Sequence, residues 1–179
     1  MKTRRAMAAL AAALLIGGGG WLFTRAKRPG VVAAPESNRA PNLTHEKAFL
    51  IEQLAHNPTH APILLRLAQI ERSEGNLPAA RQHLEQAVAA DGKQVDVRLE
   101  LGLVCWEMGD FAAAEEQNRT VLRIQPGQPD ALYNLGAIAA NRGNATQARQ
   151  FWMDAVRSGR NSDAAGKARQ AVERLEAAR

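Results

Sequence analysis

The sequence predicts an all-α solenoid, an array of helix pairs stacked side by side. One reason is that a layout of leucine, glycine and alanine recurs every 34 residues through the middle of the 179-residue chain. Another is that each copy has a glycine followed by Asn or Asp at its centre, which is typical of a turn between two helices. Fixed-period repeats of this length are the sequence signature of stacked helical units.

The repeat is clearest when its central copy, residues 95–128, is shifted by 34 residues in either direction. Four positions then agree in residue type across three copies, which indicates an internal repeat. The matching sets are Leu67, Leu101 and Leu135; Gly75, Gly109 and Gly143; Asn76, Asp110 and Asn144; and Ala80, Ala114 and Ala148.

Each matching residue type has a physical role in a helix, turn, helix unit. The glycine can end the first helix because it takes the left-handed conformation without a Cβ penalty. The Asn or Asp that follows can accept free N–H groups of the second helix. The alanine lies one turn into that helix, where a small side chain lets two backbones approach closely. Pro126 cannot continue a helix and closes the central unit.

With these residues the chain resembles the tetratricopeptide repeat family, whose unit is 34 residues long. The motif positions are Leu64, Leu67-Ala68, Gly75, Ala80, Leu84 and Ala87; Leu101-Gly102, Gly109, Ala114 and Pro126; and Leu132, Leu135-Gly136, Gly143, Ala148, Trp152 and Ala155. Arg98 and Asn118 depart from the pattern where large apolar residues are usual, and Gly92 and Arg160 replace the closing proline. The resemblance implies a binding scaffold whose concave face holds peptides or partner helices.

The periodicity and composition divide the chain into seven expected segments. They are a basic head and membrane anchor or signal (1–28), a Pro-rich linker (29–43), an N-terminal capping helix (44–60), three repeats (61–94, 95–128 and 129–162) and a C-terminal capping helix (163–179). Thr44 is expected to cap the first helix. In the last segment Ala164, Ala168 and Leu175 share one helix side, as suits a helix that shields the end of a solenoid.

The net charge of +5 is concentrated at the N-terminus. Residues 1–43 carry seven Lys and Arg side chains against one acidic side chain, a net +6, so residues 44–179 carry −1. The part expected to fold is therefore nearly neutral, which argues against a nucleic-acid partner. We interpret the basic residues as a membrane topology signal.

Residues 6–23 form an uncharged run of 18 residues. As a helix the run would extend roughly 27 Å, just enough to cross the hydrocarbon core of a bilayer. Basic residues follow it directly without a clear small-residue cleavage site, which favours an uncleaved anchor over a cleaved signal. Gly17 to Gly20 weaken the helix and keep cleavage open. We expect a single-pass bacterial inner-membrane protein with its repeats in the periplasm. The alternative is a cleaved signal and a soluble periplasmic protein.

No chemistry-bearing constellation stands out of the helical pattern, so the sequence predicts neither an enzyme nor a cofactor. Cys105 falls on an inward helix face and is expected to be a buried free thiol. His56 and His60 are four apart, but Pro58 lies between them, so no metal site is expected.

The candidate site is the concave face, lined by the first helix of each unit. Its expected residues are Leu65, Gln69 and Arg72; Leu99, Leu103 and Trp106; and Tyr133, Asn134, Ala137 and Asn141. The alternative is that Leu99, Leu103 and Trp106 only pack between neighbouring units. The family's carboxylate clamp needs basic residues, whereas the matching positions carry Leu65, Gln69, Glu100, Asp130 and Asn134. An apolar or mixed peptide is therefore expected rather than an acidic tail.

Two functions remain open from the sequence. One is a membrane-tethered binding module, without chemistry of its own, that recruits or assembles envelope proteins. The other is a structural subunit whose stack is permanently occupied in an oligomer or larger envelope assembly.

Overall fold

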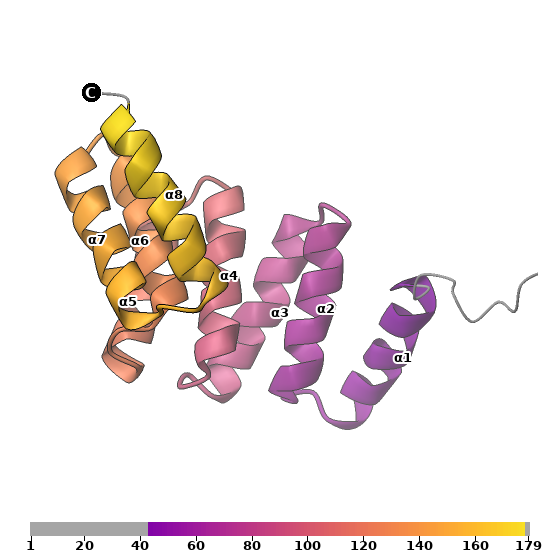
Figure 1. Cartoon of the computed structure of the whole chain (residues 1–179). Coiled ribbons are helices and arrows are strands. Elements are labelled where there is room, and N and C mark those ends of the chain that lie inside the picture. Colours follow the sequence, from indigo (N-terminus) through magenta and orange to yellow (C-terminus); the bar gives the residue numbers. More distant parts are fainter. Residues whose placement is uncertain (1–42, 178–179) are drawn as a thin grey trace, which may run out of the picture. The chain divides into compact units, whose positions relative to one another are not determined.

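The computed structural model describes residues 43–177, which lie in the second of two units of the chain, Arg39–Arg179. These residues form eight α-helices and no strand (Figure 1). The helices are α1 (Leu43–His56), α2 (Ala61–Ser73), α3 (Leu77–Ala90), α4 (Val95–Glu107), α5 (Phe111–Ile124), α6 (Pro129–Asn141), α7 (Ala145–Ser158) and α8 (Asp163–Ala177). The predicted basic head, anchor and most of the predicted linker lie outside the described residues.

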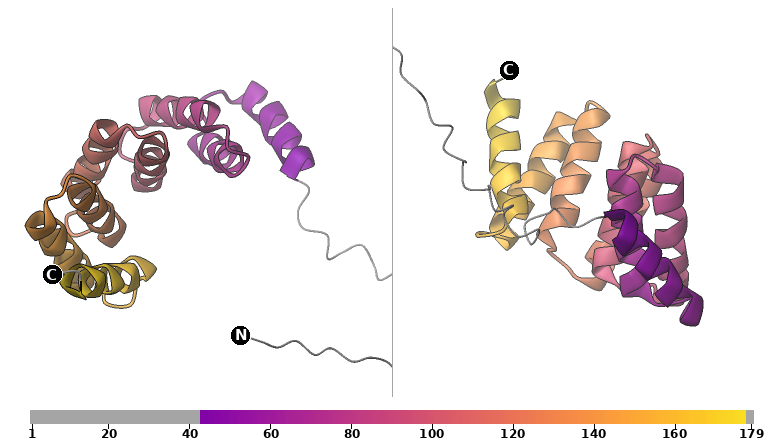
Figure 2. Two further views of the ribbon diagram at one scale, coloured as in Figure 1. Left: turned by 90° about the horizontal axis from the view of Figure 1, so that it is seen from above. Right: turned by 90° about the vertical axis from the view of Figure 1, so that its right-hand side faces the viewer.

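Three helix pairs form the body of this unit. Helices α2 and α3, α4 and α5, and α6 and α7 pack within pairs, and each pair packs on the next. The pairs follow one another along a curve (Figure 2). Their side chains share two apolar clusters, one centred on α2 to α4 and one on α6 to α8. The prediction of an all-α solenoid of helical repeats is confirmed.

The turn inside each pair has the predicted conformation. Gly75, Gly109 and Gly143 have φ angles of 81°, 80° and 75°, in the left-handed region that glycine adopts readily. The residue after each glycine donates its backbone N–H to a carbonyl five residues earlier, at 2.8 to 2.9 Å. This bond is the hallmark of the Schellman helix end.

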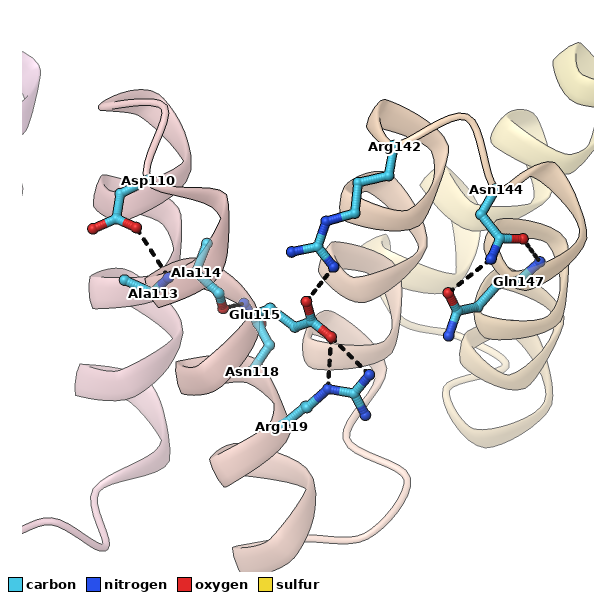
Figure 3. A network of polar contacts seen from close by, with 9 residues as sticks. All are labelled: Asp110, Ala113, Ala114, Glu115, Asn118, Arg119, Arg142, Asn144 and Gln147. Atoms are coloured by element: carbon cyan, nitrogen blue, oxygen red, sulfur yellow. Dashed lines mark hydrogen bonds and ion pairs between the residues drawn. The ribbon is translucent and has the colours of Figure 1, made fainter.

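The predicted side-chain caps form in two of the three repeats. Asp110 accepts a hydrogen bond from the Ala113 N–H, and Asn144 accepts one from the Gln147 N–H, both at 3.1 Å (Figure 3). Asn76 makes no such cap. Its amide instead donates to the buried Glu71 carboxylate at 2.8 Å, because that acceptor lies within reach at the end of the preceding helix.

Small residues stand where helices come closest. Ala80, Ala114 and Ala148 are all buried, as are the motif leucines of the first helices, Leu64, Leu67, Leu101, Leu132 and Leu135. A Cβ placed on Gly136 would lie 2.4 Å from the Trp152 indole. Glycine at this position therefore lets α7 lay a tryptophan directly against α6.

The terminal helices cover the stack unequally. Helix α1 begins at Leu43, so Thr44 lies inside the helix and is not the residue that precedes it, as we had expected. No residue of α1 is fully buried, and Lys47 links it to α2 through Glu71 and Glu74 at 3.0 and 2.6 Å. Helix α8 buries Ala164, Ala165 and Ala168, in agreement with its predicted inward side.

Among the helices of residues 43–177, none combines the length and apolar character needed to cross a membrane. The predicted span, residues 6–23, lies outside this range.

Candidate functional site: a pocket and groove along the first helices

Eight of the ten predicted groove residues line two adjoining hollows. The first, which we call the Asn118 pocket, has a volume of about 250 Å³. It is lined by Gly102, Leu103, Trp106, Asn118, Tyr133, Asn134, Ala137 and Ile138. The second, which we call the outer groove, has a volume of about 430 Å³. It is lined by Leu65, Gln69, Asp96, Leu99, Glu100, Leu103, Asp130, Tyr133, Asn134, Ala164 and Lys167.

The two hollows share Leu103, Tyr133 and Asn134, so they form one continuous surface across the repeats. Its residues come from α2, α4 and α6, with one contribution from α5 and two from α8. The predicted role of the first helices in lining the face is visible here. The contribution of α8 was not part of the prediction.

Arg72 and Asn141 line neither hollow. Arg72 donates to Glu100 at 2.8 Å and to Glu107 at 2.9 Å, so it joins α2 to α4. Partial burial lowers the pKa of the Arg72 guanidinium, but the Glu100 and Glu107 carboxylates have the larger combined effect and raise this pKa. Arg72 therefore stands beside the two hollows, and its predicted role in binding stays a prediction. Asn141 is exposed at the end of α6.

Asn118 is the site residue that the sequence prediction missed. Its side chain is only 1% exposed, and its amide donates to the Ala114 carbonyl oxygen at 2.7 Å (Figure 3). Its Oδ1 accepts from the Asn134 amide at 3.0 Å. A buried polar group needs such partners. The available signal was the departure from the repeat pattern, since a large apolar residue is usual at this position.

Trp106 has contacts in the core and also a surface on the pocket. It packs against the core cluster of α2 to α4 and also lines the Asn118 pocket. Its ring meets the Phe111 ring edge-on, with centroids 4.8 Å apart and planes at 62°. This arrangement is favourable for aromatic rings and fixes the pocket wall.

The electrostatics of the outer groove are set by three carboxylates and one cation. Asp96 and Asp130 are exposed on the first turns of α4 and α6, where a negative charge also favours the helix dipole. Glu100 is shared with Arg72, and Lys167 of α8 is the cation among the lining residues. The groove is therefore weakly acidic.

The structure places Cys105 as the sequence predicts, as a buried free cysteine. Burial raises the pKa of its thiol, which disfavours the reactive thiolate. Residues 43–177 contain no group of three or more His, Cys, Asp and Glu side chains arranged to hold a metal ion.

An array of turn-linked helix pairs with a continuous groove along its first helices defines a helical-repeat protein. A model of the tetratricopeptide repeat matches residues 65–129 and 99–162, more than half of the chain, and the chain belongs to this family. Tetratricopeptide repeat proteins generally mediate protein–protein interactions.

Two curated relatives are much longer than this chain. Intraflagellar transport protein 70B of Rattus norvegicus is 35% identical over 96 residues, 49% of this chain and 14% of that protein. Cellulose synthase 2 operon protein C of Komagataeibacter xylinus is 30% identical over 125 residues, 70% of this chain and 8% of that protein. Both similarities cover only a small part of the relative.

Solved structures share the fold at lower sequence identity. MamA has a TM-score of 0.66 at 17% identity, covering 74% of this chain and 76% of that one. YrrB, a tetratricopeptide repeat protein with an unusual peptide-binding site, has a TM-score of 0.63 at 20% identity, covering 72% of this chain and 66% of that one.

Proposed function

We propose that this protein is a non-catalytic module that binds segments of other proteins along its concave face. The observation that carries the proposal is the continuity of the Asn118 pocket with the outer groove, which spans α2, α4 and α6. Family membership supports it, and the peptide-binding site named for YrrB shows that a neighbour in fold has one.

The lining residues suit an extended or helical segment with apolar anchors. Leu65, Leu99 and Leu103 provide apolar contact, while the Gln69 and Asn134 amides can donate to and accept from a peptide backbone. A groove with apolar walls and a few placed polar groups is the usual form of a recognition site. The contacts expected are thus apolar anchors together with main-chain hydrogen bonds.

The binding test replaces Trp106 and Tyr133 with alanine, one at a time, and measures recovery of partners cross-linked in membranes. Truncating an aromatic hot spot costs on the order of 2 kcal/mol or more, a drop of roughly thirtyfold in affinity. Ile124→Ala is the control, because Ile124 is an exposed apolar residue at the end of α5, outside both hollows. Undiminished recovery by two normally folded variants would remove the groove as the site.

We further propose that residues 6–23 tether the module to a bacterial inner membrane, so that the repeats recruit or assemble envelope proteins in the periplasm. The uncharged run and the basic residues on both sides support this proposal. The full-length protein should stay in the membrane fraction after carbonate washing and keep its N-terminus. A soluble periplasmic chain that starts near Ala33 or Pro35 would support the cleaved-signal alternative instead.

A second function, a structural subunit of a permanent assembly, is favoured by the N-terminal end of the stack. Helix α1 leaves Phe49 and Ile51 exposed by 58% and 53%. A concentration series by analytical ultracentrifugation separates the two functions. A stable monomer supports the binding module, and an assembly that persists on dilution supports the structural subunit.

A further inference from the structure

We propose that the Asn118 pocket receives a tryptophan side chain of the bound segment, and that a lysine or arginine next to this tryptophan lies in the outer groove. The inference rests on the proposed function, because it names the anchor residue that the concave face recognises.

The pocket exists because two side chains are smaller here than at the equivalent positions of the preceding joint. Asn118 stands where the first repeat has Leu84 and the third has Trp152, so the second helix lacks the large apolar side chain of its neighbours. On the opposite wall, Ala137 stands where the preceding repeat has Leu103. The volume that these side chains do not fill is the cavity of about 250 Å³.

The third repeat shows what fits such a space. Trp152 lies against Gly136, and its indole N–H donates to the Tyr133 carbonyl oxygen at 3.1 Å. Gly102 is the equivalent glycine of the second repeat, and the shorter Asn118 side chain lies against it, 2.7 Å from where a Cβ would stand. Asn118 does not reach as far as an indole, and the Asn118 pocket remains. An indole supplied by a partner would therefore restore apolar packing that the second repeat lacks.

The walls of the pocket favour an aromatic occupant over an aliphatic one. Trp106 and Tyr133 offer two ring systems, and Phe111 holds the first of them in place. Aromatic pairs contribute about 0.5–1.5 kcal/mol beyond the area that they bury. Leu103 and Ile138 complete an apolar lining that matches the body of the indole.

The two asparagines favour an occupant that also carries a hydrogen-bond donor. Asn118 is buried and donates one amide bond to Ala114. The Asn134 Oδ1 accepts no hydrogen bond from the residues that the structure describes, and Asn134 lines the pocket. An indole N–H can bond to such an oxygen. A leucine would leave these polar groups without new partners, and unpaired buried groups are costly.

Charge complementarity selects the neighbour of the tryptophan. The outer groove opens from the pocket at Leu103, Tyr133 and Asn134, and its carboxylates belong to Asp96, Glu100 and Asp130. Asp96 and Asp130 form no ion pair with any residue of 43–177, and Arg72 is engaged by Glu100 and Glu107. With Lys167 counted, the lining still carries net negative charge, which attracts a lysine or arginine and repels an acidic residue.

The experiment titrates the ¹⁵N-labelled full-length chain with a minimal probe, N-acetyl-tryptophanyl-lysine amide. The observed signals are the side-chain amides of Asn118 and Asn134 and the indole N–H of Trp106. All three should shift and saturate with the probe. The leucyl-lysine and tryptophanyl-glutamate amides should bind at least about tenfold more weakly, because each lacks one of the two recognised groups.

Ala137→Leu tests the pocket by filling it from the wall, as Leu103 does in the preceding joint. We expect at least about a tenfold loss of probe affinity with an unchanged melting temperature, whereas Ala112→Leu at an exposed position of α5 should change neither. A second variant, Asn118→Leu, introduces the residue that the first repeat has at this position, so it narrows the pocket and also removes the amide. In this variant the tryptophanyl-lysine and leucyl-lysine amides should bind with more similar affinities.

The double variant Asp96→Asn, Asp130→Asn tests the charge of the outer groove. It should bind the tryptophanyl-lysine amide more weakly than the wild type does, and this binding should depend less on salt.

Equal binding of the tryptophan and leucine probes to the wild-type chain would overturn the proposal, as would full probe affinity in Ala137→Leu. Leu99→Asp separates this outcome from failure of the proposed function, because Leu99 lines only the outer groove. If Leu99→Asp loses the native partner and Ala137→Leu keeps it, the groove binds partners and the tryptophan pocket is wrong. If both variants keep the native partner, the concave face is not the binding site.

Discussion

Alanine and glycine side chains at fixed repeat positions determine how closely the helices of this protein approach. Ala114 is buried, and its carbonyl oxygen would lie 3.6 Å from a Cβ placed on Gly102 of the partner helix. Because protein interiors are close-packed, a larger side chain at such a contact has no free volume to enter. Substitutions at Ala114 of α5 and at Gly136 of α6 test this at two helix contacts.

Ala114→Leu should destabilise the protein by about 1–3 kcal/mol, the usual cost of overpacking a core. In a domain of this size that loss lowers the melting temperature by several degrees. The matched control is Ala112→Leu on the same helix, where the alanine is exposed. Equal melting of the two variants would show that α4 and α5 are not in tight contact at Ala114.

Gly136→Ala and Gly166→Ala should have effects of opposite sign. A Cβ on Gly136 would lie 2.4 Å from the Trp152 ring and would displace its bond to the Tyr133 carbonyl. A Cβ on Gly166 would meet nothing within 4 Å. There alanine should stabilise α8 by up to about 1 kcal/mol, because glycine is the poorer helix former. Urea unfolding midpoints measure the stability of both variants. Midpoints that shift in the same direction would contradict the predicted opposite effects.

The sequence predicted the residues whose structural role recurs in every repeat. It did not predict contacts that occur in only one repeat. The turn glycines and the Asp110 and Asn144 caps follow from the repeat, but the Asn76 amide is taken by Glu71, a contact specific to one unit. Eight of the predicted groove positions, which were chosen from the family resemblance and helical spacing, line the two hollows, and their role in binding stays a prediction. Asn118 was visible in the sequence only as a departure from the repeat pattern, because its partner Asn134 lies on the next helix pair and is brought to it by packing.

Ion pairs join successive elements, and the sequence pattern did not predict them. Arg72 reaches Glu100 and Glu107 on α4, and Arg66 reaches Glu46 on α1. These partners are separated by between 20 and 35 residues along the chain, so only the packing of one repeat on the next brings them together. These charges therefore fasten successive helix pairs, and α1, to one another.

The ion pairs of Glu115 make the stability of the protein depend on pH. It joins α5 to the end of α6 through Arg142 and also pairs with Arg119 at 2.7 Å (Figure 3). Partial burial opposes its ionisation, but the hydrogen bonds from the two arginines outweigh burial and hold the pKa of the Glu115 carboxyl below its usual range. A depressed acid pKa stabilises the fold above the unfolded-state pKa, and this stability is lost as pH falls through the folded-state pKa.

Glu115→Gln should therefore reduce the stability lost between neutral pH and about pH 3, a range that includes the ordinary pKa of glutamate near 4.3. The difference should be a fraction of 1 kcal/mol, because these are partly solvated pairs. Urea unfolding at both pH values measures it. The control is Glu116→Gln, an exposed neighbour on the same helix. Identical acid losses in the wild type and Glu115→Gln would exclude a contribution from this network.

At the scale of the whole molecule, the two ends of the stack are closed by different means. Helix α8 buries three alanines and packs on both α6 and α7. Helix α1 buries no residue fully and is fastened by ion pairs and by Leu54 at the edge of the core. In a solenoid, stability is roughly the sum of the units and the contacts between neighbours. The α8 end should therefore contribute more to stability than the α1 end.

The last prediction compares two truncations with the full chain. All eight described helices lie within residues 39–179, and both apolar clusters are built from them, so this fragment should keep its helical circular dichroism and melt cooperatively. A fragment of residues 39–162 removes α8 and uncovers Trp152 and the side chains around it. Exposing apolar surface costs about 25 cal/mol per Å², so the shorter fragment should melt at a markedly lower temperature.

Loss of helix or aggregation in 39–179 would show that residues 1–38 are part of the fold. Equal melting of the two fragments would show that α8 is dispensable and that the stack ends at α7.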